Sequence, residues 1–142
     1  MRISTKSRHA ITAMLEIALQ DRSVTLSMIS DNNGISLSYM EQFFAALRFK
    51  GLVKGQRGPG GGYVLGKQAE EISIVDIITS VDEWVEYNFS KPKMVVPPSQ
   101  ALSTQLLWND LSHQIYDFLG SISLADVMAK GPTYQDLLNE AA

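Results

Sequence analysis

Residues 55–65 read GQRGPGGGYVL, the run of the chain whose residue types most suggest chemistry. A glycine-rich loop cradles a phosphate when it leads from a strand into the amino terminus of a helix. Here the glycines lead into YVLG, which is β-prone, and no Gly-Lys-Ser/Thr follows. The context excludes a nucleotide cradle. A plain flexible hairpin and a DNA-binding wing that presents Arg57 remain, and the neighbouring elements favour the wing.

A second polar set lies on the run SLSYMEQFFAALRFKG. On a helix, Ser38, Tyr39 and Gln42 fall opposite the apolar residues Leu37, Met40, Phe44 and Leu47. Glutamine can pair with adenine through two hydrogen bonds, whereas Ser and Tyr more often contact phosphate. Glu41 has two open interpretations: it closes a capping box with Ser38, or it reads or rejects cytosine.

The elements needed to position these residues can be predicted from periodicity. A helix is expected from about residue 7 to residue 19, with Ser4, Thr5 or Ser7 as its cap, and a short helix should stop at Gly34. Ser36 is a natural cap for a helix over 37–50, and LVKG and YVLG read as a hairpin. This order is that of a winged helix-turn-helix, in which the helix at 37–50 enters the major groove. The wing glycines would let the backbone approach DNA, with Arg57 in the minor groove.

Charge is unevenly divided along the chain. Residues 1–67 hold nine Lys/Arg and four acids, a net of +5, whereas residues 68–142 hold three bases and eleven acids, a net of −8. A basic half suits a nucleic-acid partner. Lys6, Arg8, Arg48 and Lys50 are candidate phosphate contacts, with a solvated surface charge as the alternative for each.

The second half reads as helices around a proline-rich loop. Ser73-x-x-Asp76 predicts a capped helix, YNFSKPKMVVPPSQ a loop, and residues 101–119 a long helix, after which Ser123-x-x-Asp126 starts a short one. The long helix has an apolar seam at spacings of three and four: Trp108, Leu111, Ile115 and Phe118. Such a seam after a globular unit favours pairing with a second copy over packing on its own domain.

Composition excludes several functions. The chain has no cysteine, so thiol catalysis and thiolate metal sites are impossible. His9 and His113 have no acid or nucleophile arrangement beside them, so we expect satisfied structural histidines and no enzyme. No apolar run is long enough to cross a membrane and no secretory layout opens the chain, which predicts a soluble cytoplasmic protein.

At this point the residues carry a family resemblance. RISTKSRHAITAMLEIAL, ISDNNGISLSYMEQFFAALRFKGLV and RGPGGGYVLGK resemble the IscR-type winged-helix regulators, bacterial transcription factors that often hold an iron–sulfur cluster. With SIVDIITSVDE and LLWNDLS the resemblance spans most of residues 1–128. It implies a homodimer joined through the long helix, and base reading by the acid at position 41. The expected DNA-contact set is Arg57, Ser36, Ser38, Tyr39, Glu41, Gln42, Lys6, Arg8, Arg48, Lys50, Gly58 and Pro59.

The chain departs from that family at the sensor. Cluster-binding members have three cysteines before and at the start of the long helix and a histidine three residues after the last. Leu102 and Gln105 stand where the last cysteine and the histidine would fall. Ligation of a cluster by thiolates cannot occur, so no cofactor is expected.

The expected fold class is mainly α with a small β-hairpin wing: a winged helix-turn-helix domain plus a long C-terminal dimerisation helix. The expected divisions are a DNA-binding region at 1–67, a connecting helix at 68–87, a loop at 88–100, the dimerisation and following helices at 101–128, and a tail at 129–142. We predict a cluster-free homodimeric regulator that binds double-stranded DNA at a partly palindromic operator. Two alternatives stay open: a small-molecule effector or partner protein that docks near residues 86–105, and a winged-helix module that binds protein instead of DNA.

Overall fold

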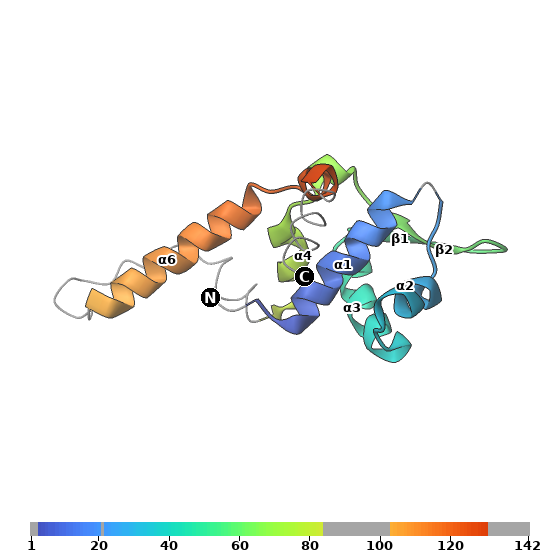
Figure 1. Ribbon diagram of the computed structural model, residues 1–142, viewed down its shortest axis with the longest axis horizontal. Coiled ribbons are helices and arrows are strands. Elements are labelled where there is room, and N and C mark those ends of the chain that lie inside the picture. Colours follow the sequence, from blue (N-terminus) through green and yellow to red (C-terminus); the bar gives the residue numbers. More distant parts are fainter. Residues whose placement is uncertain (1–2, 21, 84–102, 131–142) are drawn as a thin grey trace, which may run out of the picture.

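The structure is a computed structural model that describes residues 3–20, 22–83 and 103–130 (Figure 1). The predicted loop at 88–100, Leu102, the side chain of Gln105 and most of the predicted tail lie outside the described residues. In chain order the elements are α1 (Thr5–Leu19), α2 (Leu26–Asn33), α3 (Leu37–Phe49), β1 (Val53–Gln56), β2 (Gly62–Leu65), the 3-10 helix η1 (Ala69–Glu71), α4 (Ile74–Val81) and α6 (Ser103–Gly120). Residues 124–130 form a further short helix. The predicted fold class is confirmed.

The helix ends follow local capping chemistry. Ser4 caps α1 by accepting a hydrogen bond from the backbone N–H of Ser7, so α1 begins two residues before its predicted start. Gly34 ends α2 in the left-handed region, with a φ of 64°, as predicted. Ser73 and Asp76 form the predicted capping box of α4. The same reciprocal pair of hydrogen bonds joins Ser123 and Asp126, at 2.9 and 3.0 Å.

One core joins α1, α3 and α4. Its fully buried members include Ala10, Ala13, Met14, Met40, Phe43, Phe44, Leu47 and Ile77. Burial of each large apolar side chain stabilises the fold by about 1.5–3 kcal/mol. The predicted apolar face of α3 is wrong at one position: Leu37 is 42% exposed, and Phe43 is fully buried in its place. A period of 3.6 brings residue 43 onto the face shared by Met40, Phe44 and Leu47, while residue 37 lies in the first turn, at its edge.

The wing is an antiparallel hairpin with a third, minimal neighbour. Val53 pairs with Leu65 and Gln56 with Gly62 across the hairpin. On the outer side of β2, Val24 forms an isolated bridge with Tyr63. The loop before α2 thus adds one bridge to the wing.

The wing and α6 lie at opposite ends of the molecule, with the helical core between them (Figure 1). The segment that follows α6 is tied to the start of α4 by two backbone hydrogen bonds, from Ile74 N–H to the Ile122 carbonyl (2.9 Å) and from Leu124 N–H to the Ile72 carbonyl (2.7 Å). Leu124 is fully buried. The rest of α6 projects away from the domain. None of the described helices combines the length and apolarity needed to span a bilayer.

Candidate nucleic-acid interface

Helix α3 begins at Leu37 because Ser36 caps it. The hydroxyl of Ser36 accepts a hydrogen bond from the backbone N–H of Tyr39, at 3.2 Å. Ser38 lies inside the helix, so the predicted Ser38–Glu41 capping box is wrong. Glu41 is exposed, and its carboxylate has no hydrogen-bond or ionic partner among the described residues. Of its two interpretations, the capping box is excluded and the contact with a base stays a prediction.

The turn before α3 is held by side chains from two other elements. The carboxylate of Glu16 in α1 accepts hydrogen bonds from the amide nitrogens of Asn32 and Asn33, each at 2.6 Å. The hydroxyl of Ser30 donates to the carbonyl of Ile35, at 2.5 Å. The first two contacts hold the end of α2 against α1, and the third closes the turn that leads into α3.

The outward face of α3 is a continuous stripe. Beyond Leu37 in the first turn, the exposed residues along α3 recur at the spacing of one helix face: Ser38, Glu41, Gln42, Ala45, Arg48 and Phe49. Three of the predicted base or phosphate contacts, Ser38, Glu41 and Gln42, thus lie together near the amino-terminal end. Arg48 continues the stripe toward the wing. The exposure of Phe49, at 85%, had no counterpart in the sequence prediction.

Tyr39 differs from its predicted companions because it is half-buried. Its ring stands edge-on to Phe43 (centroids 5.5 Å apart) and to His9 of α1 (5.8 Å). Nδ1 of His9 is buried and has no hydrogen-bond partner, so the prediction of a satisfied histidine is wrong for that atom. His113, by contrast, has Nδ1 2.8 Å from the Asn109 carbonyl.

An aromatic row fixes α3 relative to the wing. The row continues from Tyr39 through Phe43 and Phe44 to Tyr63 of β2, and the last two rings have centroids 5.0 Å apart. It joins α1, α3 and the hairpin through aromatic side chains, which are rigid because they have few rotatable bonds. The outward stripe of α3 and the wing therefore share one rigid support.

The wing tip carries Arg57, Gly58 and Pro59, all exposed. Ser23 donates from its hydroxyl to the Gly60 carbonyl and holds the tip from the side of the preceding loop. Gly58 and Gly60 have φ angles of 98° and 76°, which favour glycine. The tip is thus an ordered turn, held by a hydrogen bond and by glycines in conformations that other residues rarely adopt.

Part of the predicted role of the glycines needs correction. A Cβ on Gly61 would lie 2.6 Å from the Gln56 carbonyl oxygen, and a Cβ on Gly62 would lie 2.6 Å from that of Val24. These two glycines make room for the chain's own backbone, which was not foreseen. Gly55 is different, because a Cβ there would meet nothing within 4 Å.

The predicted cations divide into two groups. Lys6 and Arg8 lie on the first turns of α1, three residues and one residue before His9, whose ring contacts Tyr39 at the start of α3. Arg48 and Lys50 are exposed at the other end of α3. Arg48 lines a hollow of about 400 Å³ together with Arg57 at the wing. The cations therefore bracket the stripe at both ends.

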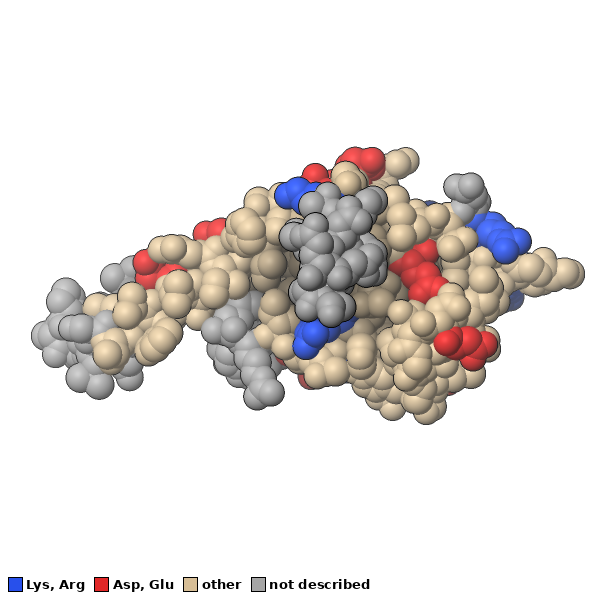
Figure 2. Space-filling model, in the orientation of Figure 1, with Lys and Arg blue, Asp and Glu red and all other residues tan. Residues whose placement is uncertain are grey.

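Helix α6 has the opposite character. It contains Asp110 and Asp117 but no Lys or Arg, and Figure 2 shows acidic and no basic side chains along its projecting part. Of the predicted seam, Trp108 (63%), Leu111 (40%) and Phe118 (64%) are exposed, and Ile115 is partly buried. An acidic helix with exposed apolar residues does not suit contact with DNA.

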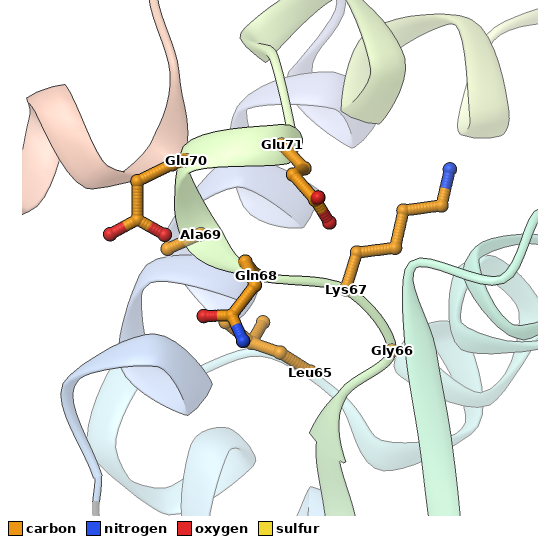
Figure 3. A pocket seen from close by; sticks show the side chains of 7 residues that line it. All are labelled: Leu65, Gly66, Lys67, Gln68, Ala69, Glu70 and Glu71. Atoms are coloured by element: carbon orange, nitrogen blue, oxygen red, sulfur yellow. The ribbon is translucent and has the colours of Figure 1, made fainter.

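Other hollows offer no convergent chemistry. One of about 560 Å³ is lined by the single run from Leu65 to Glu71, and Figure 3 shows the side chains of Lys67 and Glu70 pointing away from each other. Among the residues that the structure describes, no three His, Asp or Glu side chains gather as metal ligands would. These surfaces do not resemble a catalytic site.

Comparison with known proteins agrees with this geometry. Residues 3–130 match the Rrf2 family, described as an iron-dependent transcriptional regulator. The chain is 47% identical over 130 residues to the HTH-type transcriptional regulator IscR of Erwinia tasmaniensis, covering 90% of this chain and 79% of that protein.

Two solved structures are similar over most of the chain. CymR, the global cysteine regulator of B. subtilis, superposes with a TM-score of 0.75 and 32% identity over 91% of this chain and 97% of that chain. IscR of T. potens superposes with a TM-score of 0.75 and 30% identity, over 92% and 88%. These relatives are regulators and not enzymes. The chain therefore belongs to the Rrf2 family of winged-helix transcription regulators, as a member without the cysteines that bind an iron–sulfur cluster.

Proposed function

We propose that this chain is a sequence-specific DNA-binding regulator that acts as a homodimer on a partly palindromic operator, without an iron–sulfur cluster. One observation carries the proposal: the exposed stripe of α3 and the wing are held on one support by the Phe44–Tyr63 contact. A duplex can then take α3 in its major groove while the wing reaches the adjacent minor groove.

Base reading falls to the amino-terminal part of the stripe. The amide of Gln42 offers the donor and acceptor that pair with adenine, and the carboxylate of Glu41 can accept a hydrogen bond from cytosine N4. Ser38 lies beside them and can bond to either a base or a phosphate. The carboxylate of Glu41 gives up no hydrogen bond or ion pair within the described chain when it contacts DNA.

Positioning falls to the cations and the wing. Arg57 extends from the tip, with Gly58 and Pro59 beside it, and a narrow minor groove attracts an inserted arginine. Lys6, Arg8, Arg48 and Lys50 suit phosphate contacts around the stripe, joined by Ser36 and Tyr39 at the start of α3. Phosphate contacts of this kind set register and orientation rather than sequence preference.

The dimer is proposed to form through α6. The exposed seam of Trp108, Leu111 and Phe118 is costly to leave in water, and a second copy would cover it. Pairing through α6 would leave the wing of each protomer, at the far end of the molecule, free for a half-site. Dimers read two half-sites, which is the reason for a partly palindromic operator.

The iron-dependence in the family description does not fit these residues. An iron–sulfur cluster needs thiolate ligands, and the whole chain has no cysteine. The described residues also hold no cluster of three His, Asp or Glu side chains. The proposed regulator is therefore not switched by a cluster bound to its own side chains.

The test is selection of duplexes from a random DNA pool by the purified full chain, followed by measured affinities. A common, partly palindromic sequence should emerge. Gln42→Ala should then lose discrimination at one base position of each half-site by about 1–3 kcal/mol. Gln68→Ala, another exposed glutamine distant in sequence from α3, should bind as the wild type does. Recovery of no preferred sequence, with Gln42→Ala unchanged, would favour the protein-interaction alternative.

A further inference from the structure

A hollow of about 400 Å³ lies where α3 meets the wing. Its lining comes from one helix, two strands and the turn between them: Arg48 of α3, Gly55 and Gln56 of β1, Arg57 of the turn, and Gly62 and Tyr63 of β2. Two of these six residues are arginines and none is acidic. This residue-55 hollow is therefore a basic recess between the helix and the wing.

The hollow is open at residue 55, which has no side chain. Gly55 is the cross-strand partner of Tyr63, and residues directly opposite in an antiparallel pair project their side chains to the same face. The ring of Tyr63 contacts Phe44 of α3. A side chain at position 55 would thus stand on the face of the hairpin turned toward α3, next to Arg48.

The fold itself gives no reason for glycine at this position. Gly55 has no positive φ, and a Cβ there would meet nothing within 4 Å. Glycine inside a strand costs about 0.5–1 kcal/mol relative to alanine. A glycine that the chain does not need internally often marks the close approach of a ligand. Gly61 and Gly62 show the contrast, because both are required by carbonyl groups of the chain.

The backbone of Gly55 also has groups to offer. The N–H of Tyr63 donates to the Val24 carbonyl (2.7 Å), and the Tyr63 carbonyl accepts from the N–H of Val24 (2.9 Å). Because both backbone groups of Tyr63 face Val24, Tyr63 exchanges no hydrogen bonds with Gly55 on its other side. The N–H of Gly55 therefore lies along the outer edge of β1, where the described strands place no partner. Backbone N–H groups are common donors to DNA phosphates.

The position of the hollow selects its occupant. When a helix lies in the major groove and a wing reaches the neighbouring minor groove, one sugar–phosphate backbone must pass between them, because that backbone separates the two grooves. The residue-55 hollow lies in this space between α3 and the wing. An arginine guanidinium suits a phosphate in geometry and in charge.

We propose that the residue-55 hollow receives one backbone phosphate of bound duplex DNA, held by the guanidinium of Arg48 and the backbone N–H of Gly55. This inference rests on the proposed function and assigns a site within it. Gly55 is a positioning residue, since its missing side chain lets the phosphate approach. Arg57, at the rim, remains free to extend into the minor groove.

The decisive variant is Gly55→Ala, tested by fluorescence anisotropy on the selected duplex and on a random-sequence duplex. Affinity for both should fall together by about fivefold or more, without change of sequence preference, since phosphate contacts carry no base information. Thermal stability should stay equal or rise, because the methyl group meets open space. Arg48→Ala should also weaken binding to both duplexes and lower the slope of log affinity against log salt concentration by about 1. Lys67→Ala, a matched loss of charge at an exposed lysine beyond β2, should change neither.

A second experiment removes the charge of single phosphates in the DNA. Methylphosphonate placed at single phosphates of the selected duplex should identify one position per half-site where neutralisation weakens the wild type but not Gly55→Ala. Gly55→Ala binding as tightly as wild type would overturn the proposal. So would a methylphosphonate scan in which no single position distinguishes the wild type from Gly55→Ala. If the wild type binds no duplex, the proposed function itself fails; if it binds and only the Gly55 and Arg48 effects are absent, the phosphate site alone fails.

Discussion

Val24 and Tyr63 exchange both of their backbone hydrogen bonds, at N···O distances of 2.9 and 2.7 Å. The pair is separated by the whole of α2 and α3, so it closes the helix-turn-helix unit against the wing. Tyr63 also contacts Phe44 of α3. One residue of β2 thus joins the loop before α2, the helix proposed to read DNA, and the wing.

Disturbing this junction should destabilise the wing. In Gly62→Ala the added Cβ would lie 2.6 Å from the Val24 carbonyl oxygen, so the Val24–Tyr63 bridge must shift. We expect a loss of about 1–3 kcal/mol in the free energy of unfolding, measured by urea titration. Gly55→Ala is the matched control, because its Cβ meets nothing within 4 Å. Equal stability of the two variants would contradict the model of the junction.

Arg57 should contribute to DNA affinity without contributing to the fold. It is exposed at the wing tip, so Arg57→Ala should leave the urea midpoint unchanged. Its affinity for the selected duplex should fall by about 1–3 kcal/mol if it makes a specific groove contact. Wild-type binding should also weaken steeply as salt rises. An affinity that changes with neither the substitution nor the salt concentration would contradict the assignment of this hairpin as a DNA-binding wing.

The seam of α6 should control assembly. Leu111→Asp combined with Ile115→Asp places two charges where a second copy is proposed to pack, so light scattering should report monomers. Operator binding should weaken in parallel, because two half-sites need two subunits at a fixed spacing.

A matched control is available on the same helix. Leu106 is also an exposed leucine (43%), but at 100° per residue it lies on the side of α6 away from the seam. Leu106→Asp should therefore remain dimeric. If the double variant stays dimeric as well, the interface lies elsewhere on the chain.

Iron should have no effect on this regulator. Protein prepared without air should hold no stoichiometric iron or sulfide and show no visible absorption, since the chain has no thiolate. Its affinity for the selected duplex should be the same with or without iron and oxygen. A coloured protein, or an affinity that follows oxygen, would point to ligands from a partner chain.

The cap of helix 124–130 should make a small contribution that depends on pH. Hydrogen bonds from the backbone N–H and then the hydroxyl of Ser123 hold the pKa of Asp126 below its usual value of 3.8. A carboxylate with a lowered pKa stabilises the fold above that usual value and loses its contribution as pH falls through the folded-state pKa. Asp126→Ala should therefore be less stable than wild type at neutral pH, and the difference in thermal midpoint should close in acid. A difference that persists undiminished in acid would show that the charge is not its cause.

Local chemistry allowed much of this molecule to be read from the sequence. Caps and stops act within a few residues, so the ends of α2 at Gly34 and of α4 at Ser73 were predictable. The order of helices and hairpin followed from periodicity and predicted the winged helix-turn-helix. The absence of cysteine excludes a thiolate-bound cluster in any fold of this chain.

Only the tertiary structure decided how those elements meet. It buries Phe43 where periodicity favoured Leu37, and it adds Val24 to the wing. It also divides the glycines into those required by the chain's own carbonyls, such as Gly62, and Gly55, which faces open space beside Arg48. The physical reason is distance along the chain: a cap or a helix face is determined by neighbours within one or two turns, whereas these contacts join residues that only folding brings together.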